Sequence, residues 1–519
     1  MLRGWLAIVW LVHAGAAVCQ PLVILAYHDV RSYPADDRFS VRRGEFVEHL
    51  EYLRVHGFQP VSLEAVRQAV HGEATLPERA VLLTFDDGLK SFATFVLPVL
   101  ELYGFPAVVS VVTAWLDGEG VPAEYEGRLM DWDTVRRISR LAAVAVVSHS
   151  HDLHHGIPAN PQGDLAPAGR TRRYDPVAGR YETEAEFARR VRDDLARSLD
   201  RLEAELGQRP YALAWPYGDD DQTAMAQARR LGIEIFFTLR EQASDPGKTP
   251  RLGRILVMRG EDPLQLLRRA RQPLWQRTAR RFVELRLDAF DSIAAPAAQR
   301  RRDALLERLR RLGVNTVFVS PFTSGEDAAF FATGSFPVAG DVLSWLVRAI
   351  KARTSVDQVI LKLPAFVLRD RHADLLHDLV RLVPYDGVLL PTPCRAACRR
   401  AAKRLAAFRP DTLLGRAGHP GARPSWSFSL RFVAAGTPRE RLRRMAAESA
   451  TAPVPALLSL QIPYGDPGER LVAALKTLQN AGARHYGYGI DRFLIDSPQW
   501  AQVAPVMAPW STVQGNLPP

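Results

Sequence analysis

The sequence predicts an α/β protein built from two consecutive (β/α) barrels. Short apolar segments of strand length alternate with segments of helical periodicity, which is typical of parallel sheets with helical crossovers. The chain has 519 residues, more than one ordinary core accommodates. The alternation also restarts after an arginine-rich stretch near residues 262–280. We therefore predict one barrel over residues 20–272 and a second over residues 273–519.

Residues 1–19 are predicted to be a signal peptide, because one arginine precedes a short apolar run and small residues. Cleavage at the Ala-x-Ala-like site would release a soluble protein, whereas lipidation of Cys19 would anchor it. The valine before Cys19 is unusual for lipidation and favours the soluble form slightly. No other apolar stretch reaches spanning length, so the chain is not expected to be an integral membrane protein.

The net charge of +10 does not by itself predict a nucleic-acid partner. Arginines are spread over predicted helices and alternate with acids, for example in residues 189–206, as on a solvated helix face. Hydrophobic residues make up 47% of the chain and charged residues 24%, which is normal for a globular protein. We therefore expect no nucleic-acid binding.

In the first half, a predicted helix over residues 44–58 has Phe46, Leu50 and Leu53 at helical spacing and ends at Gly57. Residues 156–183 are rich in Pro, Gly and Arg and predict a long surface loop. The apolar segments that predict strands are residues 21–30, 80–88, 105–113, 141–150, 211–221 and 233–239.

Polar clusters follow three of these predicted strands, at His28–Asp29, at Asp86–Asp87 and from His149 onward. In parallel α/β folds the chemistry lies at the carboxyl ends of the strands. The second half repeats the alternation without a short-period repeat. Its predicted strands are residues 314–322, 358–366, 385–391, 425–432, 455–463 and 485–493.

The segment TFDDG places Asp86 and Asp87 at the end of a buried strand. Burying two adjacent carboxylates is costly unless a cation holds them, although aspartates are also common in turns and helix caps. Asp87, His149 and His154 form a three-ligand set for Zn²⁺, and Co²⁺ or Ni²⁺ would also suit it. Asp86 would then be free to accept a proton, and a histidine to donate one.

TFDDG and SHSHDLH together resemble the NodB-type polysaccharide deacetylases, a metal-dependent family with a distorted (β/α) barrel. The resemblance implies that Asp86 is the general base and that Asp87, His149 and His154 hold the metal. LAYHDV resembles a circularly permuted subgroup, which makes His28 the catalytic acid. The sequence departs from the family at Ala214, where an arginine often stands.

The motif WPYG at residues 215–218 matches the family's groove motif. The resemblance implies that the Tyr217 backbone N–H stabilises an oxyanion; its ring would otherwise pack beneath the loop. Trp215 and Pro216 become candidate substrate-binding residues. Asp131 and Trp132 are further candidates, with a helix cap and a core tryptophan as the alternative.

The motif order is similar to that of periplasmic poly-β-1,6-N-acetyl-D-glucosamine N-deacetylases, whose second barrel is of glycoside-hydrolase type. The resemblance implies deacetylation of this polymer during biofilm export, with an outer-membrane porin as partner and the periplasm as location, or the outer membrane for a lipoprotein. Deacetylation of peptidoglycan or a chitin-like glycan is an alternative, as is a non-catalytic glycan-binding export scaffold.

The second half departs from that subgroup, because YDGVLL is followed by PTPCRAAC rather than by paired acids. A glycosidase needs a proton-donating carboxyl near the scissile bond. We therefore expect the second barrel to bind glycan without cutting it. Asp386 is expected to be structural, and Asp491 is a weak candidate for a remaining acid.

Overall fold

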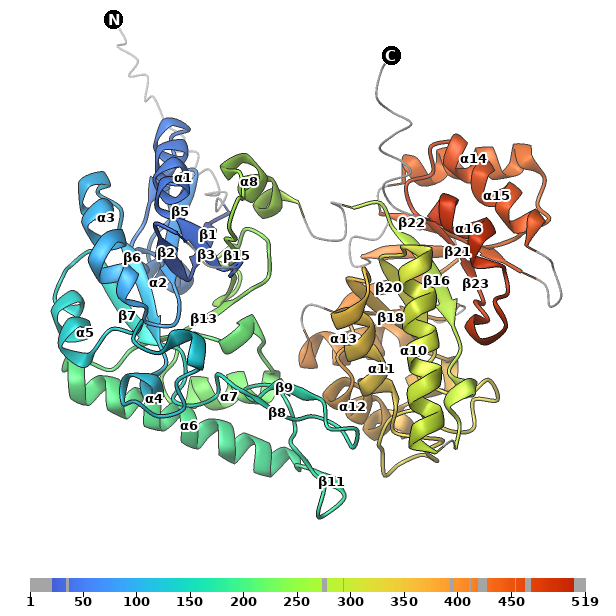
Figure 1. Cartoon of the computed structure of the whole chain (residues 1–519), viewed down its shortest axis with the longest axis horizontal. Coiled ribbons are helices and arrows are strands. Elements are labelled where there is room, and N and C mark those ends of the chain that lie inside the picture. The colour runs from blue at the N-terminus through green and yellow to red at the C-terminus, as the bar shows by residue number, and fades with distance from the viewer. Residues whose placement is uncertain are drawn as a thin grey trace, which may run out of the picture. The chain divides into compact units, whose positions relative to one another are not determined.

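The computed structural model describes residues 21–33, 37–272, 278–292, 294–392, 396–409, 412–418, 427–452, 454–462 and 468–507 (Figure 1). Its contacts divide the chain into two compact units. The first consists of Met1–His154, Asp193–Asp219 and Ala228–Pro273, and the second of His155–Arg192, Asp220–Gln227 and Leu274–Pro519. Each unit contains a (β/α) barrel, which confirms the predicted fold class.

The predicted signal peptide, with Cys19, lies outside the described residues. Within the described part of the chain, no helix combines the length and apolar character needed to cross a membrane.

The first unit is built on one parallel sheet in the order β14-β13-β12-β7-β6-β5-β1-β15, with β4 paired to β5. Strands β1, β5 and β6 are buried along their whole length, as expected for a parallel sheet with both faces covered. The strands are β1 (Val23–Tyr27), β4 (Gln59–Pro60), β5 (Ala80–Phe85), β6 (Ala107–Val111), β7 (Val144–Ser148), β12 (Ala212–Ala214), β13 (Ile235–Thr238), β14 (Arg251–Gly253) and β15 (Ile255–Leu256).

A single residue joins the two edges of this sheet. β14 pairs with β13 at one edge, β15 pairs with β1 at the other, and only Arg254 separates them in the chain. The sheet is therefore a nearly closed barrel, and Arg254 lies at its seam.

The helix predicted over residues 44–58 is α1 (Arg43–Val55), which buries Phe46, Leu50 and Leu53. A small parallel pair, β2 (Asp29–Arg31) and β3 (Ser40–Arg42), precedes it (Figure 1). The other helices assigned to this unit, wholly or in part, are α2 (Leu63–His71), α3 (Leu97–Tyr103), α4 (Thr113–Leu116), α5 (Trp132–Ser139), α6 (Glu184–Leu206), α7 (Gln222–Arg230) and α8 (Pro263–Arg271).

The predicted loop over residues 156–183 contains two short antiparallel strand pairs and groups with the second unit. Tyr181 donates a hydrogen bond to Asp341 of that unit at 2.5 Å. The paired strands are β8 (Gly156–Pro158) with β9 (Leu165–Pro167), and β10 (Tyr174–Asp175) with β11 (Arg180–Tyr181).

The second unit is a closed barrel of parallel strands from β16 to β23. All six strands predicted for this half are present, whereas β16 (Arg281–Leu285) and β20 (Leu413–Ala417) were not predicted. The six are β17 (Thr316–Val319), β18 (Gln358–Lys362), β19 (Gly387–Leu390), β21 (Phe428–Ala434), β22 (Ala456–Gln461) and β23 (Tyr486–Gly489).

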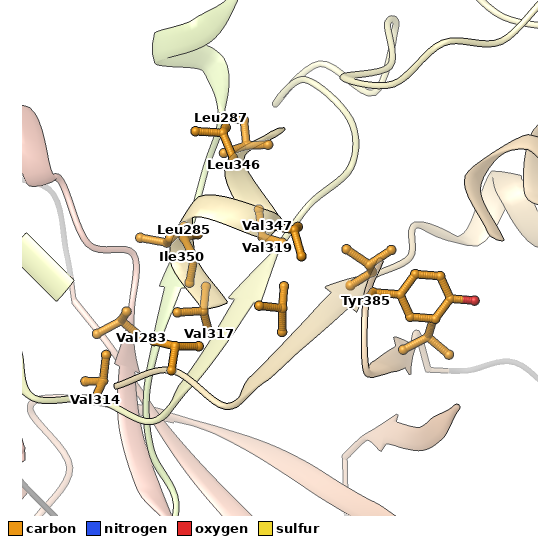
Figure 2. Close-up of a cluster of buried hydrophobic side chains, with 14 of the residues drawn as sticks. Val283, Leu285, Leu287, Val314, Val317, Val319, Leu346, Val347, Ile350 and Tyr385 are labelled. Atoms are coloured by element: carbon orange, nitrogen blue, oxygen red, sulfur yellow. The ribbon is translucent and has the colours of Figure 1, made fainter. Parts of the chain in front are cut away.

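An apolar layer fills the space between these strands and their helices. Figure 2 shows valine and leucine side chains of β16 and β17 facing Leu346, Val347 and Ile350 of α11 (Leu343–Arg353). The other helices are α10 (Ala295–Leu312), α12 (Ala373–Leu382), α13 (Ala396–Phe408), α14 (Arg439–Ala450), α15 (Glu469–Asn480) and α16 (Trp500–Met507).

Candidate active site and metal centre

The structure brings Asp87, His149 and His154 together at the carboxyl ends of β5 and β7. The Nε2 atoms of both histidines lie 3.5 Å from Oδ1 of Asp87. That oxygen is buried and has no hydrogen-bond partner among the described residues. Ligands at 2.0–2.2 Å from a tetrahedral ion lie about 3.4 Å apart, so the three residues fit a divalent metal ion.

Hydrogen bonding orients His149 for metal binding. Its Nδ1–H donates to the backbone oxygen of Ala214 at 2.7 Å, so Nε2 of the neutral imidazole directs its lone pair toward Asp87. Burial lowers the pKa of the His149 imidazole, but the carboxylates of Asp87 and Asp86 outweigh burial and raise it. Burial lowers the pKa of His154 to about 4, so its imidazole is neutral above that pH. The two aspartates thus favour positive charge at His149, and a bound metal ion would supply positive charge at the same place.

The Asp87 carboxylate is held by its second oxygen. The hydroxyl of Tyr125, at the end of a short 3₁₀ turn over Ala123–Tyr125, donates to Oδ2 at 2.8 Å. Asp87 also has a positive φ of 71°, an uncommon backbone state for a non-glycine residue that concentrates at functional sites. The Tyr125 hydroxyl thus binds Oδ2, and Oδ1 remains directed at the two histidines.

Asp86 lies beside this centre and is bound by a buried arginine. Arg254 donates to Oδ1 at 2.7 Å and to Oδ2 at 2.8 Å, and Ser110 donates to Oδ1 at 2.7 Å. Burial raises the pKa of Asp86, but the Arg254 guanidinium outweighs burial and holds it well below its usual range. A carboxylate has about four acceptor positions, so Oδ2 retains one for a further donor.

His28 completes the group after β1. Its Nε2 lies 4.0 Å from Oδ2 of Asp87, and its side chain is 15% exposed, so the imidazole reaches both the centre and solvent. Its ring packs on Phe39 with centroids 5.6 Å apart. All five residues implied by the motifs, namely Asp86, Asp87, His149, His154 and His28, therefore lie together.

Residues 73–236 match the polysaccharide deacetylase family. The poly-beta-1,6-N-acetyl-D-glucosamine N-deacetylase of Escherichia coli (strain K12) is 30% identical over 351 residues, which cover 64% of this chain and 52% of that protein. The chain thus spans about half the length of the curated relatives that it matches over the longest stretch.

Two solved structures of deacetylases are also similar to this chain. A de-N-acetylase from Aggregatibacter actinomycetemcomitans has 30% identity and a TM-score of 0.43, covering 46% of this chain and 95% of that one. The BpsB deacetylase domain from Bordetella bronchiseptica has 35% identity and a TM-score of 0.41, covering 46% and 96%. The chain carries a polysaccharide deacetylase domain. We call the first unit the deacetylase unit.

Within the deacetylase unit, Arg254 binds Asp86, which the family resemblance implies to be the base, although Ala214 stands where the family often has an arginine. Ala214 instead contributes its backbone oxygen to His149. Arg254 reaches Asp86 from the seam between β14 and β15, some distance along the chain from WPYG. The sequence departure at Ala214 is therefore offset by an arginine between two other strands, β14 and β15.

The WPYG segment of the deacetylase unit follows β12. Tyr217 has a positive φ of 59°, and its half-exposed ring packs on His154 with centroids 4.5 Å apart. The ring thus packs against His154, one of the predicted metal ligands. Trp215 and Pro216 are buried, with Trp215 fully inaccessible, so neither side chain is presented to a polymer at the surface.

Asp131 and Trp132 lie at the start of α5. Asp131 caps the helix by accepting a hydrogen bond from the Thr134 N–H at 2.8 Å. The Trp132 indole donates to Asp117 at 2.8 Å, and the guanidinium of Arg201 lies 4.8 Å from its ring centroid. These contacts are those of a helix cap and a packed tryptophan, and no contact of either residue with the five candidate side chains is present among the described residues.

In the second barrel, the two acids singled out in the sequence, Asp386 and Asp491, both accept hydrogen bonds from neighbouring residues. Asp386 accepts from the Val359 N–H at 2.8 Å and from Lys351 at 2.6 Å. Asp491 is 3% exposed and accepts from the Arg308 guanidinium and from the Tyr488 hydroxyl. Burial raises the pKa of Asp491 despite these donors.

A carboxylate missed from the sequence, Glu284, lies on β16 with 1% exposure. It accepts hydrogen bonds from Ser459, from Gln461 at 3.0 Å and from Lys362. A Cβ at the neighbouring position Gly489 would lie 2.6 Å from the Glu284 carboxyl carbon, so only glycine leaves room for this side chain.

Arg254 and Tyr125 were likewise missed. An arginine inside the apolar segment RLGRILV is a signal that could have found Arg254, because a buried guanidinium needs an acid. Tyr125 lies in a polar segment without periodicity, and no sequence signal marks it.

Proposed function

We propose that this protein is a metal-dependent hydrolase that removes N-acetyl groups from poly-β-1,6-N-acetyl-D-glucosamine. The observation that carries the proposal is the buried, unpaired Oδ1 of Asp87 facing two histidine Nε2 atoms at 3.5 Å. The name of the Escherichia coli relative supports the choice of polymer.

Asp87, His149 and His154 would hold a divalent ion, of which Zn²⁺, Co²⁺ and Ni²⁺ all suit the ligand set. When bound, such an ion activates water and polarises the acetamide carbonyl. The remaining chemistry belongs to side chains around it.

Asp86 would act as the general base, taking the proton of the attacking water at the free position on Oδ2. Arg254 keeps this carboxylate ionised and fixed in orientation. His28 would donate a proton to the departing amine, because its imidazole reaches the centre beside Asp87. The Tyr217 backbone N–H would stabilise the oxyanion, which is consistent with the strained turn that presents it.

We further propose that the protein acts in the periplasm after export by residues 1–19, as a soluble form or as an outer-membrane lipoprotein anchored at Cys19. Deacetylation exposes amines and makes the polymer cationic, which would suit it for passage through an outer-membrane porin. Residues 20–272 would carry the deacetylase activity and residues 273–519 the second barrel.

The second barrel would bind glycan without cutting it. The support is that Glu284 is engaged by Lys362 and that Asp491 is engaged by Arg308, so neither is a free proton donor. Incubation of metal-loaded protein with partially deacetylated polymer tests this. Appearance of shorter chains that persists in Asp87→Ala would contradict it.

The decisive experiment measures acetate release from poly-β-1,6-N-acetyl-D-glucosamine by metal-loaded protein, by chelated protein and by Asp87→Ala. We expect release by the first alone, with a loss of at least about 10³-fold in the variant. Asp133→Ala is a matched control, because Asp133 is exposed on α5.

Two alternatives predict different results. Release from peptidoglycan or chitin oligomers but not from the β-1,6 polymer would assign another glycan. Metal binding without release from any of them would favour a glycan-binding export scaffold.

A further inference from the structure

A pocket of about 470 Å³, lined mostly by charged and hydroxyl-bearing residues, lies beside the candidate catalytic residues of the deacetylase unit. Three segments form most of its wall: β2 with the residues that follow it, the start of α1, and the chain from Lys90 to Thr94. Gly127 and Arg128 close the remaining side. The pocket contains none of the metal ligands and neither proposed acid–base residue.

Four cationic side chains line this pocket, and Asp29 supplies the one carboxylate. Two arginines share the Asp29 carboxylate. Arg128 donates a hydrogen bond to its Oδ2, and Nε of Arg31 lies 3.7 Å from the same oxygen. Among the described residues, neither Arg43 nor Lys90 forms an ion pair with a carboxylate within 4.0 Å, although the pKa of Asp131 is lowered first by its hydrogen bond with Thr134 and further by the charge of Lys90. The guanidinium carbon of Arg43 lies 4.6 Å from the centroid of the Phe95 ring. The Lys90 ammonium donates a hydrogen bond to the Gly127 backbone oxygen at 2.9 Å.

Neutral donors add to this positive charge. The Ser91 hydroxyl oxygen accepts from the Val30 N–H at 3.2 Å, and within the described chain its own proton is not donated to another group. Guanidinium and ammonium groups that converge on one cavity bind carboxylate or phosphate oxygens through charge-assisted hydrogen bonds. The pocket therefore has the composition of an oxyanion site.

The pocket is connected to the catalytic group through adjacent residues. Asp29 follows His28 directly, and Lys90 is three residues after Asp87. Arg128 lies 5.5 Å from the ring centroid of Tyr125, whose hydroxyl binds Asp87. A ligand group in this pocket is therefore held near the proposed acid rather than on a remote face.

We propose that this pocket binds an oxyanion, and that the oxyanion is a carboxylate-bearing substituent of the glycan chain near the N-acetyl group under attack. The identity of the carrier rests on the proposed deacetylase function, whereas oxyanion binding itself does not. The same chemistry would accept a free anion such as phosphate, so the experiment has two arms.

The first arm titrates inorganic phosphate into the full-length, metal-loaded protein by calorimetry. We compare wild type with Arg43→Gln/Lys90→Gln, two exposed positions outside the catalytic group. Any phosphate bound at the metal is common to both proteins. Arg137→Gln/Arg140→Gln, exposed positions on and just after α5, removes the same charge elsewhere in the unit. We expect binding to weaken roughly tenfold or more in the first variant and less than about twofold in the second.

The second arm compares acetate release from neutral polymer and from polymer carrying succinyl half-ester groups. We expect wild type to have a kcat/KM roughly tenfold higher on the succinylated polymer, and Arg43→Gln/Lys90→Gln to lose that preference. Its kcat/KM on neutral polymer should match wild type, which also shows that the variant is folded.

Equal phosphate binding by wild type and Arg43→Gln/Lys90→Gln would overturn the oxyanion site. Weakened phosphate binding without a preference for succinylated polymer would overturn the glycan substituent and leave a free-anion site. If neither polymer releases acetate from any protein, the proposed function fails, while the phosphate titration still decides whether the pocket binds an oxyanion.

Discussion

Both barrels place a buried carboxylate near the carboxyl end of a parallel strand, but only one of these carboxylates is left available. Asp87 in the deacetylase unit and Glu284 in the second barrel are each 1% exposed. Asp87 faces two imidazoles and keeps one oxygen unpaired, whereas Glu284 accepts from a lysine and two neutral donors. Burial alone therefore does not leave a carboxylate oxygen available to a ligand.

The difference lies in the neighbouring cations. A histidine can be neutral and present a lone pair, so an Asp–His–His set has room for a metal ion. A lysine ammonium has no lone pair while charged, so it neutralises the acid and occupies the position that a ligand would take. The deacetylase unit also contains one such permanent pair, Arg254 with Asp86, beside the open centre.

Removing Arg254 is expected to have the largest effect on this comparison. Arg254→Ala leaves the Asp86 carboxylate buried without a cation, which should destabilise the fold by about 3–5 kcal/mol. It should also reduce acetate release, because Asp86 loses both its orientation and its charge partner. Thermal unfolding and kcat/KM measure the two effects.

The double variant Asp86→Asn/Arg254→Met is the matched control for stability. Because it removes both charges, it should unfold closer to wild type than Arg254→Ala does, while remaining inactive. An Arg254→Ala protein as stable as wild type would show that Asp86 does not need this partner.

Tyr125→Phe tests whether the Tyr125 hydroxyl keeps Oδ1 of Asp87 available for a metal ion. Without the hydroxyl on Oδ2, the carboxylate should rotate more freely, and metal affinity should fall about 10–100-fold. Competition with a chromophoric chelator measures this affinity directly. Tyr103→Phe, which removes a hydroxyl bound to Glu51 on the same unit, should leave it unchanged. Equal affinities for all three proteins would assign the Tyr125 hydroxyl no role at the centre.

Lys362→Met tests the carboxylate of the second barrel that is paired with a cation, Glu284. It removes the cation from Glu284, and because Lys362 is 31% exposed, water replaces part of the lost interaction. We expect a destabilisation of about 1–2 kcal/mol, smaller than for Arg254→Ala. The urea midpoint for unfolding of the second barrel measures this destabilisation. Lys351→Met is the comparison, because it removes the cation of the more exposed Lys351–Asp386 pair. A larger loss than in Arg254→Ala would reverse the ranking of the two sites.

That the candidate residues of the deacetylase unit lie together could be predicted because they belong to short motifs at the ends of strongly apolar strands, as with Asp87 after β5. Strand β16 could not, because it begins with a buried arginine and contains Glu284, which breaks the apolar pattern. Arg254 and Asp86 are 168 residues apart and meet only because β14 and β15 lie at opposite edges of one sheet. The arginine within RLGRILV marks a buried cation in the sequence, but no local pattern identifies Asp86 as its partner.

A comparison of one buried histidine in each barrel gives the test with the smallest expected effect. His149 has a pKa raised by two aspartates, whereas burial, together with Arg484, Arg280 and Arg281, lowers the pKa of His485 in the second barrel to about 3. The neutral His485 accepts a hydrogen bond from the Arg280 N–H at 3.1 Å.

Because the unfolded chain binds a proton at His485 near pH 6.5 and the folded chain only near pH 3, stability from this group is complete above pH 6.5 and lost as pH falls below it. An asparagine can accept the same hydrogen bond but does not titrate. The excess Tm of wild type over His485→Asn should therefore be larger at pH 7.5 than at pH 5, by roughly 3 °C or more. An excess that grows on acidification would mean that His485 is protonated in the fold, and that cations surround it without determining its charge.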